Sequence, residues 1–389
     1  MTSSWKVFNL IKSLKQSKPT KLFLLILPLF VSINQTAFSA THTASAIQGS
    51  FGVSGGAANY TIPITIPPGM AGMEPSVSLS YSSQGGNGLV GLGWNINGLS
   101  LISRCAQNLA QDGNIRGVDF TSEDKFCLDG ARLININGTA YGADGSEYRT
   151  ETDSFNKIFL YDADGINGPD YFEVFTKSGQ KKIYGNKGGR LDAQIEAEGR
   201  TEVHLWPMSR VEDTVGNYAE FFYFNDKANG FTRIDQINYT GNDNGGLTPS
   251  ASVKFIFEAR PDQRFGYMNG SKMNVLERLT NIQTYSGSVT GVQDLVRDYS
   301  INYTESLFTN KSIVSTINEC DANGLCKVAT NLKWNNAQTP VDTTLLTKFA
   351  ESPFSPAGTL NLSNCKSIIT ADIDGDGKSD LMCAYDYGG

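Results

Sequence analysis

The sequence predicts an all-β protein built from large antiparallel sheets, shell-like or sandwich-like. Three observations support this: short runs in which apolar and polar residues alternate, turn dipeptides between those runs, and no long helical periodicity. Side chains of a strand alternate between its two faces, so period-two alternation is typical of half-buried strands. Aromatic residues make up 11% of the chain, which suits sheets packed through Phe and Tyr.

The first 46 residues have the layout of a secretory signal peptide. An apolar run from Leu22 to Val31 precedes two small-residue cleavage sites, at 37–39 and 44–46. That run is shorter than the roughly 20 residues of a membrane-spanning helix, which disfavours the alternative of an uncleaved anchor. We expect export to the extracellular space, the cell surface or the periplasm. The basic, acid-free start contains five lysines, Lys6, Lys12, Lys15, Lys18 and Lys21.

The charge balance narrows the class of partner. The chain has 32 basic and 39 acidic residues, and loss of the lysine-containing leader leaves 27 basic residues against the same 39 acidic ones. A surface of this sign repels phosphate backbones, so we expect no nucleic-acid partner. The same negative charge is compatible with the binding of divalent cations.

Strand-like runs continue along the region 47–340, which we assign to one β domain. Tyr218–Phe224 is aromatic on both faces, which predicts burial on both sides. Turn dipeptides such as Asn229-Gly230 favour tight hairpins between the runs. The other alternating runs are Tyr60–Ile66, Ser76–Tyr81, Ser252–Glu258 and Asp298–Tyr303.

The composition changes near Asn335–Pro356, where three prolines occur with little alternation. This predicts a linker, which we place at 341–360. The last segment, 361–389, stops a few residues after a strong motif. We therefore expect the chain to be part of a longer gene product.

That motif is a predicted calcium site. Carboxylates at positions 1, 3, 5 and 9 and the carbonyl at position 7 can converge on one cation, and Gly377 permits the bend. Such an oxygen set suits Ca²⁺ better than Mg²⁺. Cys383 stands where an EF-hand needs Glu, and both flanks have strand patterns. The alternative is an acidic solvated turn. The predicted ligands are Asp372, Asp374, Asp376, Lys378 and Asp380.

Other motifs predict structure rather than catalysis, and we expect no catalytic residue. The segment from Asp162 to Asp170 resembles the calcium motif only weakly, so we predict a plain hairpin turn there. Glu196 and Glu198 have the E-x-E spacing of ADP-ribosyltransferases without its companion residues, and we expect an exposed strand face. His204 lies in an apolar run and is expected in the core. A carboxylate pair distant in sequence, as in a hydrolase, stays open.

The six cysteines fall along the chain as three nearby pairs. Export favours disulfides, and proximity favours the pairings 105–127, 320–326 and 365–383, although six cysteines allow fifteen arrangements. Zinc is the weaker alternative, because no C-x-x-C occurs and only His42 and His204 are present.

The block from Gly49 to Arg104, with its Pro67-Pro68-Gly69 turn and the Gly91-Leu-Gly-Trp94 segment, resembles the SpvB-type N-terminal region. That region occurs in the B component of insecticidal toxin complexes and in related RHS-associated bacterial toxins. Later matching segments follow in order, so the resemblance spans nearly all of 49–334. They are 125–133, 148–155, 171–179, 206–211, 237–242, 257–262 and 319–326. The strand–DxDxDGxxD–strand unit at the end resembles the first FG-GAP (VCBS) repeat of a β-propeller.

The resemblance implies a structural component of a β-shell rather than an enzyme. In this family the region begins a large β-shell that, with the C component, encloses a toxic polypeptide, while a propeller docks on the pore-forming A component. We therefore expect a non-enzymatic structural component of a secreted toxin or RHS-type protein, with other toxin components as partners. The chain departs from the family in lacking RHS repeats and in having a leader. The alternatives are an exported adhesion or binding module and, with less support, an extracellular hydrolase.

Overall fold

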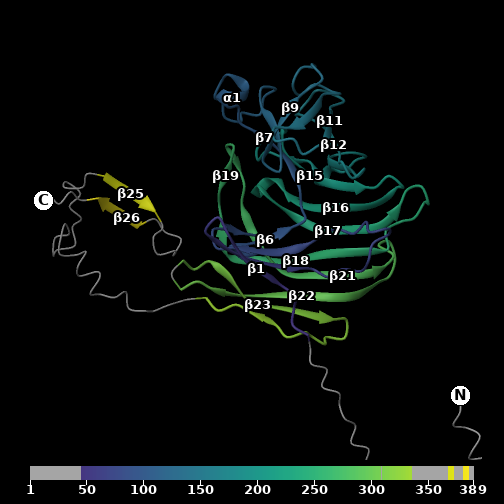
Figure 1. Ribbon diagram of the computed structural model, residues 1–389, viewed down its shortest axis with the longest axis vertical. Coiled ribbons are helices and arrows are strands. Elements are labelled where there is room, and N and C mark those ends of the chain that lie inside the picture. Colours follow the sequence, from purple (N-terminus) through teal and green to yellow (C-terminus); the bar gives the residue numbers. More distant parts are fainter. Residues whose placement is uncertain (1–44, 308, 335–366, 372–379, 385–389) are drawn as a thin grey trace, which may run out of the picture. The chain divides into compact units, whose positions relative to one another are not determined.

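The computed structural model describes residues 45–307, 309–334, 367–371 and 380–384. Strands dominate these residues, which confirms the all-β prediction (Figure 1). The helical elements are short: α1 (Leu109–Asp112) and the 3₁₀ turns η1 (Leu191–Ala193) and η2 (Lys227–Asn229). Among the described residues, no helix combines the length and apolarity needed to cross a membrane. The predicted leader, except for its last two residues, and the predicted linker lie outside them.

A four-stranded antiparallel sheet forms the start of the described chain. Its strand order is β1-β2-β3-β6, and Tyr60 pairs with Tyr81 between β2 and β3. The two alternating runs expected around the Pro/Gly turn therefore form neighbouring strands. The strands are β1 (Ser50–Ser54), β2 (Ala57–Pro63), β3 (Ser78–Ser82) and β6 (Trp94–Asn97).

Eight strands form a sheet that closes on itself. Each strand from β7 to β13 pairs with the next, and β15 pairs with both ends of the series. Leu205–Pro207 of β15 face β7, and Met208–Glu212 face β13. The strands are β7 (Leu101–Cys105), β8 (Lys125–Leu128), β9 (Ala131–Asn135), β10 (Glu147–Thr150), β11 (Lys157–Tyr161), β12 (Tyr171–Phe175), β13 (Lys181–Gly185) and β15 (Val203–Glu212).

The same β15 begins a second series of long strands, because Arg210–Glu212 also pair with β16. This series is antiparallel throughout and runs β16-β17-β18-β21-β22-β23-β24 (Figure 1). Its strands are β16 (Asn217–Asp226), β17 (Phe231–Asn242), β18 (Ala251–Arg264), β21 (Val275–Gly287), β22 (Gln293–Glu305), β23 (Ser312–Asp321) and β24 (Thr330–Asn331).

Smaller pairs complete the described structure. β4 (Asn87–Gly88) pairs with β5 (Gly91–Leu92), β19 (Tyr267–Met268) pairs with β20 (Ser271–Lys272), and β14 (Ile195–Glu196) adds to β15. Near the chain end, β25 (Ser367–Ala371) pairs with β26 (Asp380–Ala384).

The four-stranded sheet packs on the long strands through one continuous apolar core. Ile62 and Leu79 from the small sheet and Val253 and Ile282 from the long series are all fully buried in it. Burial of such side chains stabilises a fold by roughly 1.5–3 kcal/mol each. Polar contacts fix the register of the two layers, since Tyr299 Oη accepts from the Thr65 amide at 3.0 Å.

The prediction for Tyr218–Phe224 is only partly correct. Tyr218 and Phe221 are buried, but Phe224 is 40% exposed. Two register shifts, after Tyr218 and after Phe222, interrupt strict alternation in β16. The aromatic rings that miss the core are covered by guanidinium groups instead, since Arg233 lies 4.6 Å from the centre of the Phe224 ring. Such cation–π packing lets an aromatic ring remain at a wet face.

Two of the three predicted disulfides are confirmed. Cys105 is bonded to Cys127, and Cys320 to Cys326. The first disulfide connects β7 to β8. In this ladder Cys127 pairs with Ser103 and Cys105 pairs with Lys125, so the two cysteines lie diagonally across adjacent strands. The proposed pairing of Cys365 with Cys383 includes a residue that lies outside the described part of the chain.

A buried ion pair connects β18 to β23 and to the β4–β5 hairpin. The Arg260 side chain is fully buried and donates to both oxygens of Asp262, at 3.0 and 2.9 Å, and to Gly88 O at 2.8 Å. Asp262 accepts in turn from the Ser312 amide at 2.8 Å. Burial acts to raise the pKa of Asp262, but hydrogen bonds from Arg260 and Ser312 hold it below its usual range.

We predict that Asp262→Ala lowers the free energy of unfolding by about 3–5 kcal/mol, because it leaves Arg260 buried without its counter-charge. Urea denaturation of the wild type and the variant measures the change. The control is Asp235→Ala, which removes an aspartate that also pairs with an arginine but is 54% exposed. That variant should change stability by under about 1 kcal/mol. Equal losses in the two variants would contradict this account.

Candidate functional site

The structure describes only one of the five predicted calcium ligands. Asp372, Asp374, Asp376 and Lys378 lie outside the described residues, and Asp380 is the first residue of β26. The two flanks pair as antiparallel strands, with Ala371 opposite Asp380. This agrees with the predicted strand–loop–strand unit and not with the helices of an EF-hand. Calcium binding itself stays a prediction.

In the parts of the chain that the structure describes, no three His, Cys, Asp or Glu side chains converge in a way that could hold a metal ion. The acidic segment from Asp162 to Asp170 is the loop between β11 and β12, which confirms the hairpin prediction. Its carboxylates are used locally. Asp162 accepts from the Gly165 amide at 2.9 Å, and Asp170 accepts from the Ala163 amide at 3.0 Å.

This loop also lines a cavity of about 500 Å³ at one end of the closed sheet. Three other segments contribute to the walls: the β7–β8 connection, the β9–β10 connection and Glu202 just before β15. In an antiparallel sheet, alternate connections meet at the same end, so loops far apart in sequence surround one space. Loops held by a rigid sheet are the usual place for recognition.

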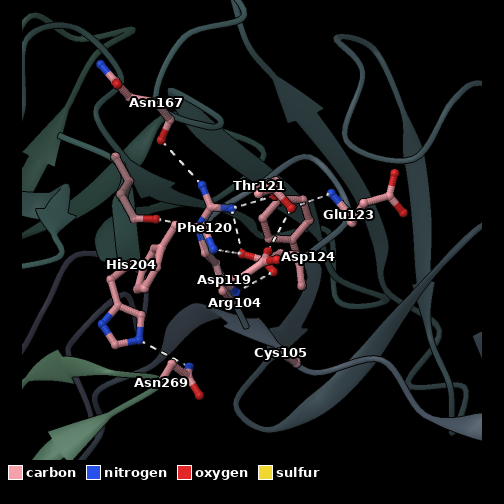
Figure 2. A network of polar contacts seen from close by, with 12 residues as sticks. Arg104, Cys105, Asp119, Phe120, Thr121, Glu123, Asp124, Asn167, His204 and Asn269 are labelled. Atoms are coloured by element: carbon pink, nitrogen blue, oxygen red, sulfur yellow. Dashed lines mark hydrogen bonds and ion pairs between the residues drawn. The ribbon is translucent and has the colours of Figure 1, made fainter. Parts of the chain in front are cut away.

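Arg104, on β7, holds the loops around the cavity together (Figure 2). Its Nε donates to Val203 O at 2.6 Å, and its Nη1 donates to Thr121 O at 3.2 Å. Its Nη2 donates to Asn167 O at 3.4 Å. A guanidinium has five N–H donors in a fixed fork, so one side chain can connect two loops and the start of β15.

The counter-charge of Arg104 is Asp124, and both side chains are almost fully buried. Asp124 Oδ2 lies 3.1 Å from Arg104 Nη1 and also accepts from the Phe120 amide at 2.8 Å, while Oδ1 accepts from the Asp119 amide at 3.0 Å (Figure 2). The two charges thus neutralise each other and each has further hydrogen-bond partners, which offsets the cost of their burial. Asp124 also shapes the turn, in which Phe120 has a φ of 65°.

An aromatic cluster adjoins the cavity, and two of its members, Phe126 and Tyr141, line it. The rings of Phe126, Phe172 and Trp206 meet edge to face, with centroids 5.3–5.5 Å apart. Trp206 Nε1 donates to Pro169 O at 2.6 Å, which ties this cluster to the β11–β12 loop. Tyr141 stacks on Phe126 at 5.8 Å. These contacts hold Phe126 and Tyr141 in fixed positions, so the cavity has both aromatic and polar lining residues.

His204 is fully buried, as predicted, and packs edge to face on Phe120 at 5.5 Å. Its Nε2 lies 3.3 Å from Asn269 Nδ2, while its Nδ1 has no partner among the described residues. Burial lowers the pKa of His204 to about 4, and the positive charge of Arg104 acts in the same direction. The imidazole is therefore neutral at pH 7.

No motif in the sequence marked Arg104 and Asp124 as site residues. A signal was present, because Arg104 and Ile102 are two residues apart and so lie on the same face of a strand. An arginine on an apolar strand face requires a buried partner. The sequence did not identify which carboxylate supplies it.

The chain is similar to known proteins both in sequence and in fold. Residues 52–248 match the family model described as Salmonella virulence plasmid 65kDa B protein, SpvB. The chain is 26% identical over 209 residues to the mono(ADP-ribosyl)transferases SpvB of Salmonella typhimurium and Salmonella dublin. The match covers 49% of this chain and 32% of those proteins, so the chain spans about a third of their length.

Solved structures with a similar fold come from toxins. The chain resembles TcdB2-TccC3 with a TM-score of 0.56 at 16% identity, over 73% of this chain and 16% of that one. The N-terminal domain of the effector SpvB from Salmonella typhimurium strain LT2 gives a TM-score of 0.54 at 14% identity, over 67% of this chain and 98% of the domain. Similarity at this level of identity shows the fold.

We predict that acid destabilises the site through His204. An unfolded histidine has a pKa near 6.5, above the value of about 4 in the fold. The unfolded chain therefore takes up the proton first, and stability is lost as pH falls from about 6.5 to 4. Arg104 is the charged group that acts on the imidazole in the described structure.

The matched variant is His204→Gln, because it keeps a polar group toward Asn269 and cannot titrate. Unfolding free energies measured at pH 7 and pH 4 should differ by about 3 kcal/mol more in the wild type than in this variant. Parallel pH profiles for the two proteins would show that His204 is not responsible.

Proposed function

Because the chain belongs to the Salmonella virulence plasmid 65kDa B protein family (SpvB), we propose that it is a non-enzymatic structural part of a secreted bacterial toxin or RHS-type protein. In this proposal its strands form part of a β-shell that houses or delivers a toxic polypeptide. Its partners are other toxin-complex or RHS components, and it reaches them after export by the predicted leader.

The observation that carries the proposal is the match to TcdB2-TccC3. Most of this chain, 73%, superimposes on only 16% of that protein. A region that forms a small part of a much larger assembly is expected to leave contact surfaces uncovered. Here β1 is exposed along its whole length, with Phe51 72% and Val53 71% exposed. Exposed apolar side chains next to each other are typical of interaction sites.

The contacts of the E-x-E pair, Glu196 and Glu198, support the non-enzymatic part of the proposal. Glu196 forms an ion pair with Lys227, and Ala197 between the two glutamates is fully buried. The amide of Glu198 donates to Ser271 Oγ at 2.9 Å. These contacts are what a strand edge requires. The chain covers 98% of the SpvB N-terminal domain structure and 32% of the named transferases, so their activity does not transfer to it.

The alternative is an exported adhesion or binding module with FG-GAP-like repeats. The β25–β26 hairpin around the acidic motif favours it. The coding sequence after Gly389 separates the two functions. RHS repeats followed by a variable toxin region support the shell, and a series of further DxDxDGxxD repeats supports the adhesion module.

Both proposed functions, the shell component and the adhesion module, include a bound structural calcium ion. We place a structural Ca²⁺ on Asp372, Asp374, Asp376 and Asp380, with the carbonyl of Lys378 completing the oxygen set. Four carboxylates in one short loop repel each other, and a bound divalent cation relieves that repulsion. The antiparallel pairing that begins at Ala371 and Asp380 brings the two ends of the loop together.

We predict that electron cryo-microscopy of the complete gene product shows a β-walled shell with an enclosed space, and that the strands of this chain lie in its wall. The many antiparallel pairings formed by β15 to β23 supply such a wall. Separate modules joined by linkers, with no enclosed space, would contradict the shell proposal.

We predict that calcium raises the melting temperature of the β25–β26 region. A ligand that binds only the folded state at 100 times its dissociation constant stabilises by about 2.7 kcal/mol. Calorimetric titration should show one high-affinity calcium per chain, and Asp376→Ala should abolish it. Asp164→Ala is the matched control, because it removes a carboxylate from the similar loop that forms a plain hairpin. Identical melts in calcium and in chelator would exclude the site.

A further inference from the structure

The proposed shell function assigns no role to the cavity at the end of the closed sheet. The cavity's volume of about 500 Å³ falls within the roughly 300–1,000 Å³ range of small-molecule sites. Four separate segments build it, and the Arg104–Asp124 pair fixes their positions. A pre-formed space lined by polar groups and by the rings of Phe120, Phe126 and Tyr141 has the general composition of a ligand site.

Arg104 lines this space and has one guanidinium N–H for which the described residues supply no acceptor. Its side chain is 4% exposed, and four of its hydrogen bonds are accounted for, to Val203, Thr121, Asp124 and Asn167. A guanidinium has five N–H groups. One Nη2 hydrogen is therefore without a partner among the described residues. An unsatisfied buried donor is unfavourable, and an acceptor oxygen of a ligand would satisfy it.

Carboxylates supply the complementary acceptors. Asp144 and Asp162 lie in neighbouring loops, and Asp144 Oδ1 accepts from the Asp162 amide at 3.0 Å, which leaves Oδ2 free. Glu202 lines the cavity from the segment before β15 and acts electrostatically on Arg104. The cavity thus presents both a donor and several acceptors.

The backbone around the cavity is also unusual. Phe120 and Asn167 both line it and both have a φ of 65°. A bulky aromatic residue rarely adopts this left-handed conformation, and such strain is concentrated at functional sites. Here the strain is maintained by Asp124, which accepts from the Phe120 amide, and by Arg104, which binds the Asn167 carbonyl.

The chemistry of the lining selects among ligands. A divalent metal is disfavoured, because the described residues contain no group of three ligating side chains. An anion would meet Asp124, Asp144, Asp162 and Glu202, and a simple cation would meet Arg104. A neutral molecule with many hydroxyl groups satisfies all of them, because each hydroxyl donates to a carboxylate and accepts from an N–H. The apolar C–H face of such a molecule suits the rings of Phe120, Phe126 and Tyr141, which line the cavity.

We propose that this cavity binds a neutral carbohydrate, a short glycan whose hydroxyls bridge Arg104 and the rim carboxylates Asp144, Asp162 and Glu202. The site is independent of the shell proposal and would give the assembled protein a means of attaching to a glycan surface. No covalent step is involved.

Saturation-transfer difference NMR on the purified chain tests the proposal, with maltotriose, cellotriose, lactose and N-acetylchitotriose as probes. At least one saccharide should show transfer, and calorimetry then gives its dissociation constant. Ala143→Trp fills the cavity without changing its charge and should weaken that saccharide at least tenfold. Glu202→Gln should weaken it as well, by removing an acceptor, and serves alone if the tryptophan variant fails to fold. Glu305→Gln, an exposed glutamate far from the cavity on β22, is the matched control and should bind as the wild type.

Three results would overturn the proposal. The first is no transfer from any of the four saccharides at millimolar concentration. The second is binding that Ala143→Trp and Glu202→Gln leave unchanged while both variants keep the wild-type melting temperature. The third is preferential, salt-sensitive binding of spermidine or arginine amide, which would make the cavity a cation site.

Discussion

The structure depends on one strand that belongs to two sheets. β15 pairs with β7 and β14 along its first half and with β13 and β16 along its second half. Such a strand must be buried on both faces, and seven consecutive residues of β15, Val203–Ser209, are buried. Backbone groups with partners on both sides leave no free edge, so closure of the first sheet and the start of the second are a single constraint.

This constraint positions the cavity. Closure brings β7 next to the beginning of β15, which puts Arg104 within 2.6 Å of the Val203 carbonyl. The same closure buries Arg104 and Asp124 together, and their mutual hydrogen bonds offset the cost of removing two charges from water. The loops at this end of the sheet are then held by a rigid frame. A cavity formed in this way persists without a ligand, since little of its lining has to be ordered when a ligand binds.

The similarity to known proteins concerns the sheet framework, whereas the candidate site is formed largely by loops. Family membership and the similarity to toxin components rest on the sheet framework, which extends through most of the described chain. The cavity rests on loops, where related proteins of the same fold differ most. A wall function and a ligand function can therefore exist together in one chain, because the first uses the pairing of strands and the second uses the rim of the closed sheet.

The sequence alone determined the features that depend on neighbours along the chain. Period-two runs predicted β2, β3, β18 and β22, proximity predicted the disulfides Cys105–Cys127 and Cys320–Cys326, and turn chemistry predicted the hairpin at 162–170. The expected burial of His204 also followed from its apolar neighbours.

Only the tertiary structure decided the closure of the sheet, the exposure of Phe224 and the partners of Arg104. Arg104 and Val203 are 99 residues apart, and Arg104 and Asn167 are 63 apart. Periodicity reports which face a side chain lies on, but not which distant strand or loop meets that face. That choice results from the pairing of the whole sheet and from the requirement that every buried charge finds a partner.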